Sequence, residues 1–453
     1  MRHVVIALLL FAGCSHSNDH LESDGGNDSC AGVTCDQPPA TTCANAIEVT
    51  YATTGTCTNN TCSYAPTTTD CTAPANATAV CTSNACDFTC DAGYTKSGAA
   101  CVSSDLDPSA IAVGARHACA LVASGVWCWG YNGFGELGTG STSPTIQPTP
   151  VAVTGLAAGV TAISVGDETS CAIVSGGVWC WGYDGDQQLG SGATTSATPV
   201  AVQGLSSGVT AISVGLFSSC AVVNGGAQCW GTNTFGELGN NTTTPSATPV
   251  AVQGLSSGVT AIAVGAGYAC AVASGGVQCW GQNPFIAESN VPTAISGWSA
   301  NVTSISVGED AICAIVNGAA QCFGDNNAGQ IGNESNEVAV TPVAVQGLTS
   351  SVTTISAGNE TGCAVMNGAV ECWGANQDGQ LGDSTMAASS TPVGVTGLST
   401  GASAVAVGND ENGNYVSACA IVSGGVQCWG YGEYGELGNG SNVNSDAPVA
   451  VQL

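Results

Sequence analysis

Positive charge is almost absent from this sequence. Lys and Arg together number 3 in 453 residues, against 32 Asp and Glu, so the formal net charge is −29. Proteins that bind a nucleic-acid backbone neutralise its phosphates with Lys and Arg. A chain whose cations are Arg2, Lys96 and Arg116 therefore argues against a nucleic-acid partner. The charge fits a soluble surface, the binding of cations or a basic partner protein.

Long hydrophobic runs are also missing. The apolar run Val4 to Ala12 is too short to span a bilayer and is typical of a signal peptide. No later segment is apolar enough to cross a membrane. The run ends in Phe-Ala-Gly-Cys, which resembles a bacterial lipobox, and this resemblance implies lipidation of Cys14. We predict a signal peptide at 1–13 and a polar, flexible tether at 14–29.

The same resemblance implies a location. A lipidated cysteine would anchor the chain outside the cytoplasm on a bacterial membrane, and Ser15 after it favours the outer membrane or cell surface. We expect the chain to contact the membrane only through this N-terminal lipid anchor.

Cysteine, in contrast, is abundant. Of the 25 cysteines, ten lie at 30, 35, 43, 57, 62, 71, 81, 86, 90 and 101. Large apolar residues are few between them, so we predict a small module at 30–104 that is stapled by disulfides. The connectivity stays open. Zinc is the weaker alternative, because this stretch has neither a Cys-x-x-Cys pair nor a histidine.

A unit of about 50 residues repeats seven times between residues 105 and 453. Its most regular mark is a pair of cysteines nine positions apart. The pairs are Cys119 and Cys128, Cys171 and Cys180, Cys220 and Cys229, Cys270 and Cys279, Cys313 and Cys322, Cys363 and Cys372, and Cys419 and Cys428.

The apolar pattern of each unit predicts four short strands and no helix. In the third unit they are "VTAISVG" (209–215), "CAVV" (220–223), "AQCWG" (227–231) and "TPVAV" (248–252). Alternating or short apolar runs bounded by Gly and Asn indicate strands. Seven four-stranded repeats predict an all-β fold, a seven-bladed β-propeller. The last run (448–453) could complete blade seven alone or share a blade with the entering strand.

The cysteine spacing fits a hairpin. Asn224-Gly225 favours a two-residue type I′ turn, which places Cys220 opposite Cys229 on a non-hydrogen-bonded pair. Cα atoms in such a pair lie roughly 4.5–5.5 Å apart, and a disulfide tolerates about 4.4–6.8 Å. We therefore predict one disulfide per repeat, between neighbouring strands.

The unit "VGARHACALVASGVWCWGYNGFGELG" (113–138) resembles the repeat of the regulator of chromosome condensation family. The resemblance extends over 105–453 and implies a seven-bladed propeller. Its departures are Phe323 in place of Trp, and residues 281–290, which lack the Gly-x-Leu-Gly element. The family includes an activator of a nuclear GTPase that binds chromatin, and also secreted bacterial proteins such as an inhibitor of β-lactamases. It implies a loop-built face that binds another protein.

In a four-stranded meander, the loops after the first and the third strands share one rim, named here the loop rim. Aromatics among carboxylates on loops suit protein binding. The same loops carry Arg116, Tyr131, Phe134 and Asp186. Our candidate partner-binding residues are Asp167, Glu168, Phe217, Tyr268, Glu309, Asp310, Glu360, Asp410, Glu411 and Tyr415 after first strands, and Tyr183, Tyr431 and Tyr434 after third strands.

Signals for metal binding and for catalysis are weak. Asp410, Asn412 and Asn414 offer alternating oxygens, but Tyr415 stands where a calcium loop of the EF-hand type needs Gly, so no metal is assigned and calcium stays an alternative. "GLSSG" at 204–208 matches a nucleophile elbow but lies between strands, which favours a turn. The repeats contain one histidine, His117, which we expect to be a packed, hydrogen-bonded residue.

These observations favour a non-enzymatic cell-surface lipoprotein. Its propeller would bind an unidentified protein through acidic, aromatic loops, without cofactor and without nucleic acid. Two alternatives remain open. One is a carboxylate-based enzyme acting on surface glycans, which would need two acids at a defined separation. The other is a structural surface protein without a specific ligand.

Overall fold

The computed structural model describes the C-terminal part of the chain almost throughout and the N-terminal part in short segments. The described residues are 15–16, 33–34, 36–44, 47–54, 56–58, 61–70, 77–82, 85–90, 94–97, 100–103, 107–192, 195–409 and 415–453. The chain divides into two compact units, Met1–Leu106 and Asp107–Leu453. The predicted signal peptide and Cys14 lie outside the described residues.

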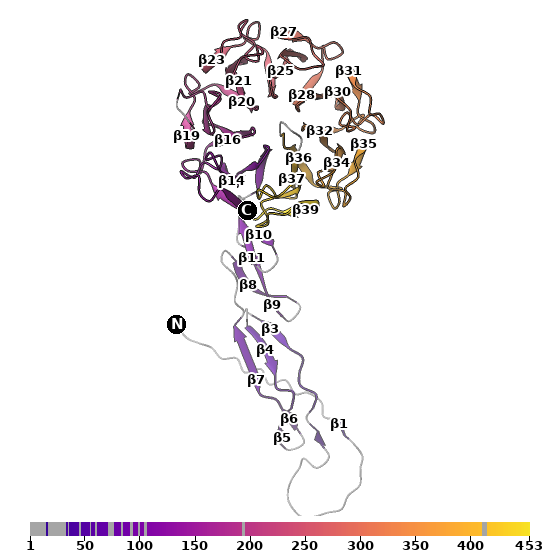
Figure 1. Cartoon of the computed structure of the whole chain (residues 1–453). Helices are drawn as coiled ribbons and strands as arrows, with labels where there is room; N and C mark the ends of the chain where they lie inside the picture. The colour runs from indigo at the N-terminus through magenta and orange to yellow at the C-terminus, as the bar shows by residue number, and fades with distance from the viewer. Residues whose placement is uncertain are drawn as a thin grey trace, which may run out of the picture. The chain divides into compact units, whose positions relative to one another are not determined.

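The first unit consists of short antiparallel strands (Figure 1). Cys57 lies opposite Cys62 in one hairpin, and Cys81 lies opposite Cys86 in another. Cys62 and Cys86 are disulfide-bonded, as expected for a stapled module. The strands are β1 (Ser15–His16), β2 (Val33–Thr34), β3 (Thr42–Ala44), β4 (Ile47–Tyr51), β5 (Thr56–Thr58), β6 (Thr61–Ser63), β7 (Pro66–Asp70), β8 (Ala77–Thr82), β9 (Ala85–Cys90), β10 (Tyr94–Ser97) and β11 (Ala100–Ser103).

The second unit is a seven-bladed β-propeller, which confirms the predicted fold class. Seven four-stranded antiparallel sheets stand in a ring (Figure 1). The innermost strands, one per blade from blade one to blade seven, are β12 (Pro108–Val113), β16 (Val160–Val165), β20 (Val209–Val214), β24 (Val259–Val264), β28 (Val302–Val307), β32 (Val352–Ala357) and β36 (Ala402–Val407).

The second, third and fourth strands follow outward in each blade. The second strands are β13 (His117–Val122), β17 (Thr169–Val174), β21 (Ser218–Val223), β25 (Tyr268–Ala273), β29 (Ala311–Val316), β33 (Thr361–Met366) and β37 (Ser417–Val422). The third are β14 (Gly125–Tyr131), β18 (Gly177–Gly182), β22 (Gly226–Gly231), β26 (Gly276–Gly281), β30 (Ala319–Gly324), β34 (Ala369–Gly374) and β38 (Gly425–Gly430). The fourth are β15 (Ile146–Ala152), β19 (Ser196–Ala201), β23 (Ser246–Ala251), β27 (Ser289–Ala294), β31 (Ala339–Ala344), β35 (Ser389–Gly394) and β39 (Ser445–Ala450).

The ring closes without a shared blade. β39 pairs with β38, and all four strands of blade seven are consecutive in the chain. The entering strand β12 starts blade one and packs against β36 and β37. Closure therefore depends on the same face-to-face packing that joins every other pair of blades.

The predicted hairpin geometry is confirmed. Asn224 and Gly225 both have positive φ, 51° and 80°, as a type I′ turn requires. Cys220 lies directly opposite Cys229. All seven predicted disulfides are present, with Cα–Cα distances of 4.0–4.1 Å. These distances are shorter than the ranges predicted from the strand pairing and from disulfide geometry.

A recurring hydrogen bond joins neighbouring blades, and we call it the latch. The buried indole of Trp181 in blade two donates from Nε1 to the carbonyl oxygen of Glu136 in the last loop of blade one, at 2.7 Å. A Cβ atom on Gly138, whose φ is 64°, would lie 2.9 Å from the same Nε1. The glycine that ends Gly-x-Leu-Gly therefore leaves room for the indole.

Six of the seven seams carry the latch, at donor–acceptor distances of 2.7–2.9 Å. The remaining pairs are Trp230 with Gln188, Trp280 with Glu237, Trp373 with Gln330, Trp429 with Gln380 and Trp129 with Glu436. The last pair joins blade one to blade seven, so the seam that closes the ring is latched like the others.

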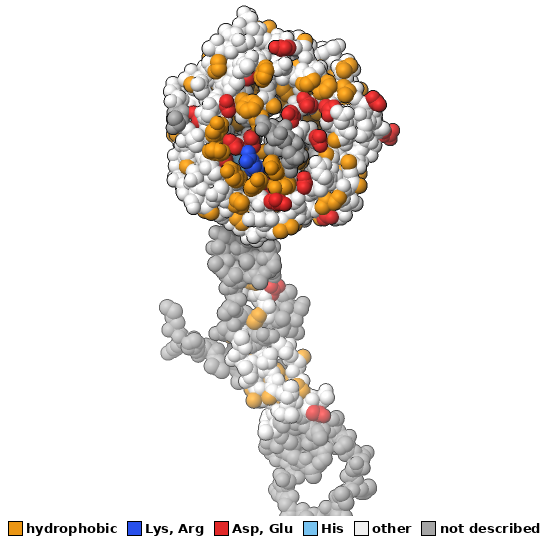
Figure 2. All heavy atoms as spheres, viewed as in Figure 1, with side chains coloured by type: hydrophobic (Ala, Val, Ile, Leu, Met, Phe, Trp, Pro, Cys, Tyr) orange, Lys and Arg blue, Asp and Glu red, His pale blue; other side chains and the backbone are white. Residues whose placement is uncertain are grey.

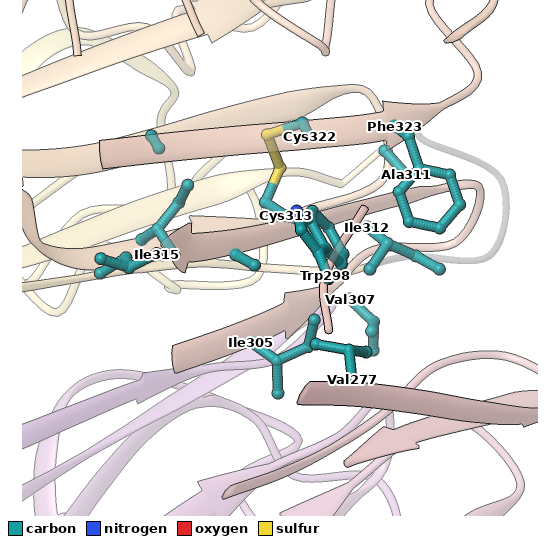
Figure 3. Packing of buried hydrophobic residues seen from close by; sticks show 14 of the residues in the cluster. Val277, Trp298, Ile305, Val307, Ala311, Ile312, Cys313, Ile315, Cys322 and Phe323 are labelled. Carbon is teal, nitrogen blue, oxygen red and sulfur yellow. A yellow bond between two sulfur atoms is a disulfide. The ribbon is translucent and has the colours of Figure 1, made fainter. Parts of the chain in front are cut away.

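The seam between blades four and five is built differently (Figure 3). Phe323 takes the indole position, and Trp298 occupies the turn position that is leucine in the first, second, third, fifth and sixth blades. The Trp298 ring lies 5.2 Å from that of Phe323 and is fully buried, and its Nε1 donates to Gln321 Oε1 at 2.9 Å. Trp298 and Phe323 thus belong to one buried cluster in the seam that lacks the latch.

Trp298→Leu tests this packing. Although leucine is the residue of the corresponding turns, we expect the variant to lose roughly 2–4 kcal/mol of unfolding free energy, because a cavity would remain against Phe323. Denaturant unfolding measures the loss. Val340→Ala is the control on the outside of the same seam, since Val340 is 70% exposed and should cost little. Equal midpoints for Trp298→Leu and the wild type would contradict the interpretation.

Candidate functional site

The loop rim faces the viewer in Figure 2. Acidic and hydrophobic side chains are distributed around the middle of the ring, with one basic side chain among them. That side chain belongs to Arg116, the only Lys or Arg between residues 107 and 453. The loop rim therefore carries one cation in a largely acidic and aromatic surface.

Arg116 links the first loops of blades one and two. One terminal nitrogen lies 2.9 Å from Glu168 Oε1 and 3.6 Å from Asp167 Oδ1. The guanidinium also lies over the Tyr131 ring, 5.2 Å from its centroid. Two predicted residues, Asp167 and Glu168, are thus brought together around the positive charge, which fixes the position of their loop.

Four tyrosines gather where blade seven meets blade one, and we call them the tyrosine cluster. Tyr415 lies 5.0 Å from Tyr431 and 5.7 Å from Tyr434, and Tyr434 lies 5.7 Å from Tyr131. Tyr431 is buried beneath the others, whereas Tyr131, Tyr415 and Tyr434 are half-buried. Burial raises the pKa of Tyr431, so its phenol keeps its proton and lies 3.2 Å from Glu433 Oε2. Of the three predicted residues in the cluster, Tyr415 and Tyr434 are accessible to a partner, whereas Tyr431 is buried and supports them from below, which corrects its prediction as a contact residue.

A pocket of about 280 Å³, the rim pocket, opens between the loops of blades one, two and three. One part of its wall is an aromatic pair, Phe134 and Tyr183, with ring centroids 5.0 Å apart. Its lining residues are Arg116, Phe134, Asp167, Glu168, Tyr183, Asp186, Gln188, Leu216 and Phe217. Four candidate residues from the sequence therefore lie in one concavity. Leu216 and Gln188 were not predicted, since no charge or aromatic ring marks them.

Tyr268 requires a correction. Its side chain is 1% exposed, and its hydroxyl donates to the carbonyl oxygen of Gly308 at 2.9 Å. It begins β25, at the position that His117 holds in β13. Both side chains are buried because this position points into the seam. Tyr268 therefore lies beneath the loop rim and offers no surface to a partner.

The other candidates are spread around the ring. Glu309, Asp310 and Glu360 are half-buried in the first loops of blades five and six. Burial raises the pKa of the Asp310 carboxyl, with a smaller contribution from the charge of Asp325. Asp410 and Glu411 lie outside the described residues, as do Asn412 and Asn414 of the calcium alternative. Within the described residues no three His, Cys, Asp or Glu side chains are placed to bind a metal ion, and no helix is long and apolar enough to cross a membrane.

His117 is buried, as expected, with its Nε2 2.7 Å from the Ser170 hydroxyl oxygen. Burial lowers the pKa of His117 to about 3, so the imidazole stays neutral. Its position within the seam, away from solvent, is that of a packing residue.

Buried glutamates form a second set of perturbed groups. The Glu136 carboxylate Oε2 accepts a hydrogen bond from the Phe134 amide at 2.9 Å, and Glu436 accepts one from the Tyr434 amide at 2.9 Å. Burial raises the pKa of each carboxyl to about 8. Both side chains are fully buried. Raised carboxyl pKa values often indicate general acids.

Here the repeats favour a structural role instead. Gln188, Gln330 and Gln380 take the same position in other blades, and each accepts the corresponding amide through Oε1. A protonated glutamate has the hydrogen-bonding groups of a neutral side chain, as glutamine does. The glutamates therefore act as neutral supports of the loops above them, and they give the enzyme alternative no accessible acid.

The fold and the loop rim define a class of protein, a β-propeller that presents one loop-built face. The family follows from comparison. A model described as Regulator of chromosome condensation (RCC1) repeat matches residues 124–173, 175–222, 224–272, 317–365 and 367–411, and a second RCC1 repeat model matches 109–136. These matches cover more than half of the chain, which belongs to the RCC1 repeat family. Residues 273–316, between two matches, include the variant turn around Trp298.

Solved structures agree on the fold. Human WBSCR16 is 20% identical, with a TM-score of 0.64 over 73% of this chain and 94% of its own. Prp20p from Saccharomyces cerevisiae, whose structure was described together with its binding to Gsp1p and histones, is 20% identical, with a TM-score of 0.63 over 77% of this chain and 88% of its own. A further structure shows yeast RCC1 (Prp20) bound by Kap60, at 19% identity and a TM-score of 0.63 over 77% of this chain and 86% of its own.

The buried glutamates predict a pH dependence. Their pKa rises from 4.5 in the ordinary state to about 8 in the fold. Between these values the unfolded chain binds fewer protons than the folded one. The two carboxyls cost the fold nothing below pH 4.5, where they are protonated in both states. As pH rises from 4.5 toward 8, the free energy of unfolding falls by up to about 1.4 kcal/mol per pH unit for each group. The double variant Glu136→Gln and Glu436→Gln should show a flatter dependence and greater stability at pH 8.

Denaturant unfolding at pH 5 and pH 8 measures this effect. The matched control is Glu334→Gln with Glu337→Gln, two exposed side chains in blade five, which should keep the wild-type slope. If the variant at residues 136 and 436 loses as much stability between these pH values as the wild type does, the neutral state of the glutamates is refuted.

Proposed function

We propose that this chain is a cell-surface lipoprotein whose propeller binds a partner protein through the loop rim. The observation that carries the proposal is the tyrosine cluster beside the aromatic wall of the rim pocket. Both are presented by loops and held by contacts between blades. Tyr and Phe are enriched at protein interfaces, where rigid rings supply contact area at a low cost in conformational entropy.

Charge defines the chemistry of the partner. A formal net charge of −29 favours rapid association with basic surfaces and disfavours acidic ones. Among proteins of similar fold, Prp20p is described with its binding to Gsp1p and histones, which supports a protein partner for a propeller of this kind. The lipid anchor at Cys14 would hold the chain at the membrane where such a partner is met.

Capture of a partner tests the binding surface. Immobilised full-length chain should retain a specific protein from an envelope extract of its own host, measured by quantitative mass spectrometry. The double variant Tyr415→Ala and Tyr434→Ala removes two half-buried rings, and we expect it to retain about tenfold less, a typical loss for aromatic interface anchors.

Trp179→Ala is the matched control. Trp179 is also aromatic, is 37% exposed and lies within β18, outside the loops of the rim. Retention should survive this change. Equal retention by the wild type and the tyrosine variant, or loss in both variants, would argue against the loop rim as the binding surface.

Anchoring is tested separately. In a bacterium with an outer membrane, the wild-type chain should fractionate with membranes and incorporate labelled fatty acid. Cys14→Ser removes the thiol that carries the lipid, so the label should be lost and the chain released into the soluble fraction. Label that persists on the Cys14→Ser chain would contradict the predicted lipidation site.

A further inference from the structure

The rim pocket combines two features that serve one kind of ligand. Its wall contains aromatic rings, with the Phe134–Tyr183 pair at 5.0 Å and Phe217 from the next blade. Aromatic faces attract cations through the ring quadrupole, an interaction strengthened when water is displaced. Its remaining polar groups are mostly carboxylates, which favour the same sign of charge.

The pocket has a net charge of −2 when its groups are ionised. Asp167, Glu168 and Asp186 supply three negative charges against the single positive charge of Arg116. Arg116 lies next to Glu168 and Asp167, 2.9 and 3.6 Å away. Asp186 is on the other side of the pocket lining, in the last loop of blade two, where its Oδ1 accepts a hydrogen bond from the Thr232 hydroxyl at 3.3 Å.

The surroundings add to this negative potential. Asp184 lies close enough to Asp186 for the two charges to interact, and burial followed by that charge raises the pKa of the Asp184 carboxyl. This negative potential would repel an anionic ligand. Arg116 would attract such a ligand little, because its charge is already offset by two carboxylates. The electrostatics of the pocket therefore favour a cation.

Size restricts the ligand further. A volume of about 280 Å³ lies just below the range of roughly 300–1,000 Å³ that is usual for small-molecule sites. It suits one long side chain that enters from solvent. The flexible stem of Lys or Arg packs on apolar surface while its charged end meets carboxylates, and Arg in addition stacks on aromatic rings.

We infer that the rim pocket receives a single Lys or Arg side chain of the partner protein. This inference rests on the proposed binding function and names the group that the loop rim recognises. The partner would place its basic side chain between the Phe134–Tyr183 wall and the Asp186 carboxylate, next to its contact with the tyrosine cluster. Such an anchor in a desolvated pocket is typical of interface hot spots.

Short blocked peptides test the inference on the full-length chain. Gly-Arg-Gly and Gly-Lys-Gly are titrated by ligand-detected NMR at low salt, beside Gly-acetyllysine-Gly and Gly-Glu-Gly. We expect the two cationic peptides to bind and the two others to bind about tenfold more weakly, since they lack the positive charge. Tighter binding of the glutamate peptide would overturn the inference, because Arg116 would then be the recognising group.

Two variants locate the site. Asp186→Asn removes a charge from the pocket without touching the Arg116 ion pair, and it should weaken the cationic peptides about three- to tenfold. Glu334→Gln, an exposed change of equal charge in blade five, should leave them unchanged. If the two variants bind alike, attraction comes from the overall charge and the pocket assignment is wrong. In that case, loss of partner capture by the double variant Tyr415→Ala and Tyr434→Ala would still support the proposed function. The proposed function and the pocket assignment can therefore fail separately.

Discussion

The structure depends on one recurring interaction, the latch between an indole N–H and a loop carbonyl of the preceding blade. Glu136 shows that the residue which accepts the latch also holds the loop rim. Its carbonyl oxygen accepts from Trp181 of the next blade, while its carboxyl accepts the amide of Phe134 on the loop rim. The same arrangement recurs at Glu436, which receives Trp129 and supports Tyr434. Each latch therefore joins two blades, and the residue that accepts it also holds the backbone of a residue on the loop rim.

The unlatched seam shows what this interaction demands of the sequence. A buried indole N–H without an acceptor would be costly, as would a buried carbonyl oxygen without a donor. In this seam Phe323 replaces the indole, the loop at 281–290 lacks the Gly-x-Leu-Gly element, and Trp298 packs against Phe323. Because Trp298 donates to Gln321 instead, its own N–H is satisfied. This seam keeps other hydrogen bonds, such as that from the Tyr268 hydroxyl to the carbonyl oxygen of Gly308, and lacks only the latch that the other six seams carry.

Most of the fold could be predicted from the sequence because its strongest signals are local. A two-residue turn at Asn224-Gly225 sets the register of its hairpin, and the register places Cys220 opposite Cys229. Contacts between blades carry no such signal, so the role of Trp298 was not predicted. The burial of Tyr268 could have been, since alignment of the repeats places it at the position of His117, which was expected to be packed.

The loop rim could be predicted from the sequence, whereas the rim pocket could not. The reason lies in the symmetry of the propeller. A ring of near-identical blades offers seven equivalent seams, so a ligand that binds once must use residues in which the blades differ. Those differences meet where blades seven, one, two and three adjoin. Arg116 occurs in one repeat only, the tyrosine cluster spans one seam, and Asp186 lies at a position that is Phe134 in blade one and Phe235 in blade three. Each residue is visible in the sequence, but the rim pocket needs the loops of three consecutive blades, about 50 residues apart, and the tyrosine cluster needs the seam that closes the ring between Tyr131 and Tyr434. Departure from the repeat, rather than the repeat itself, therefore marks where this propeller is specialised.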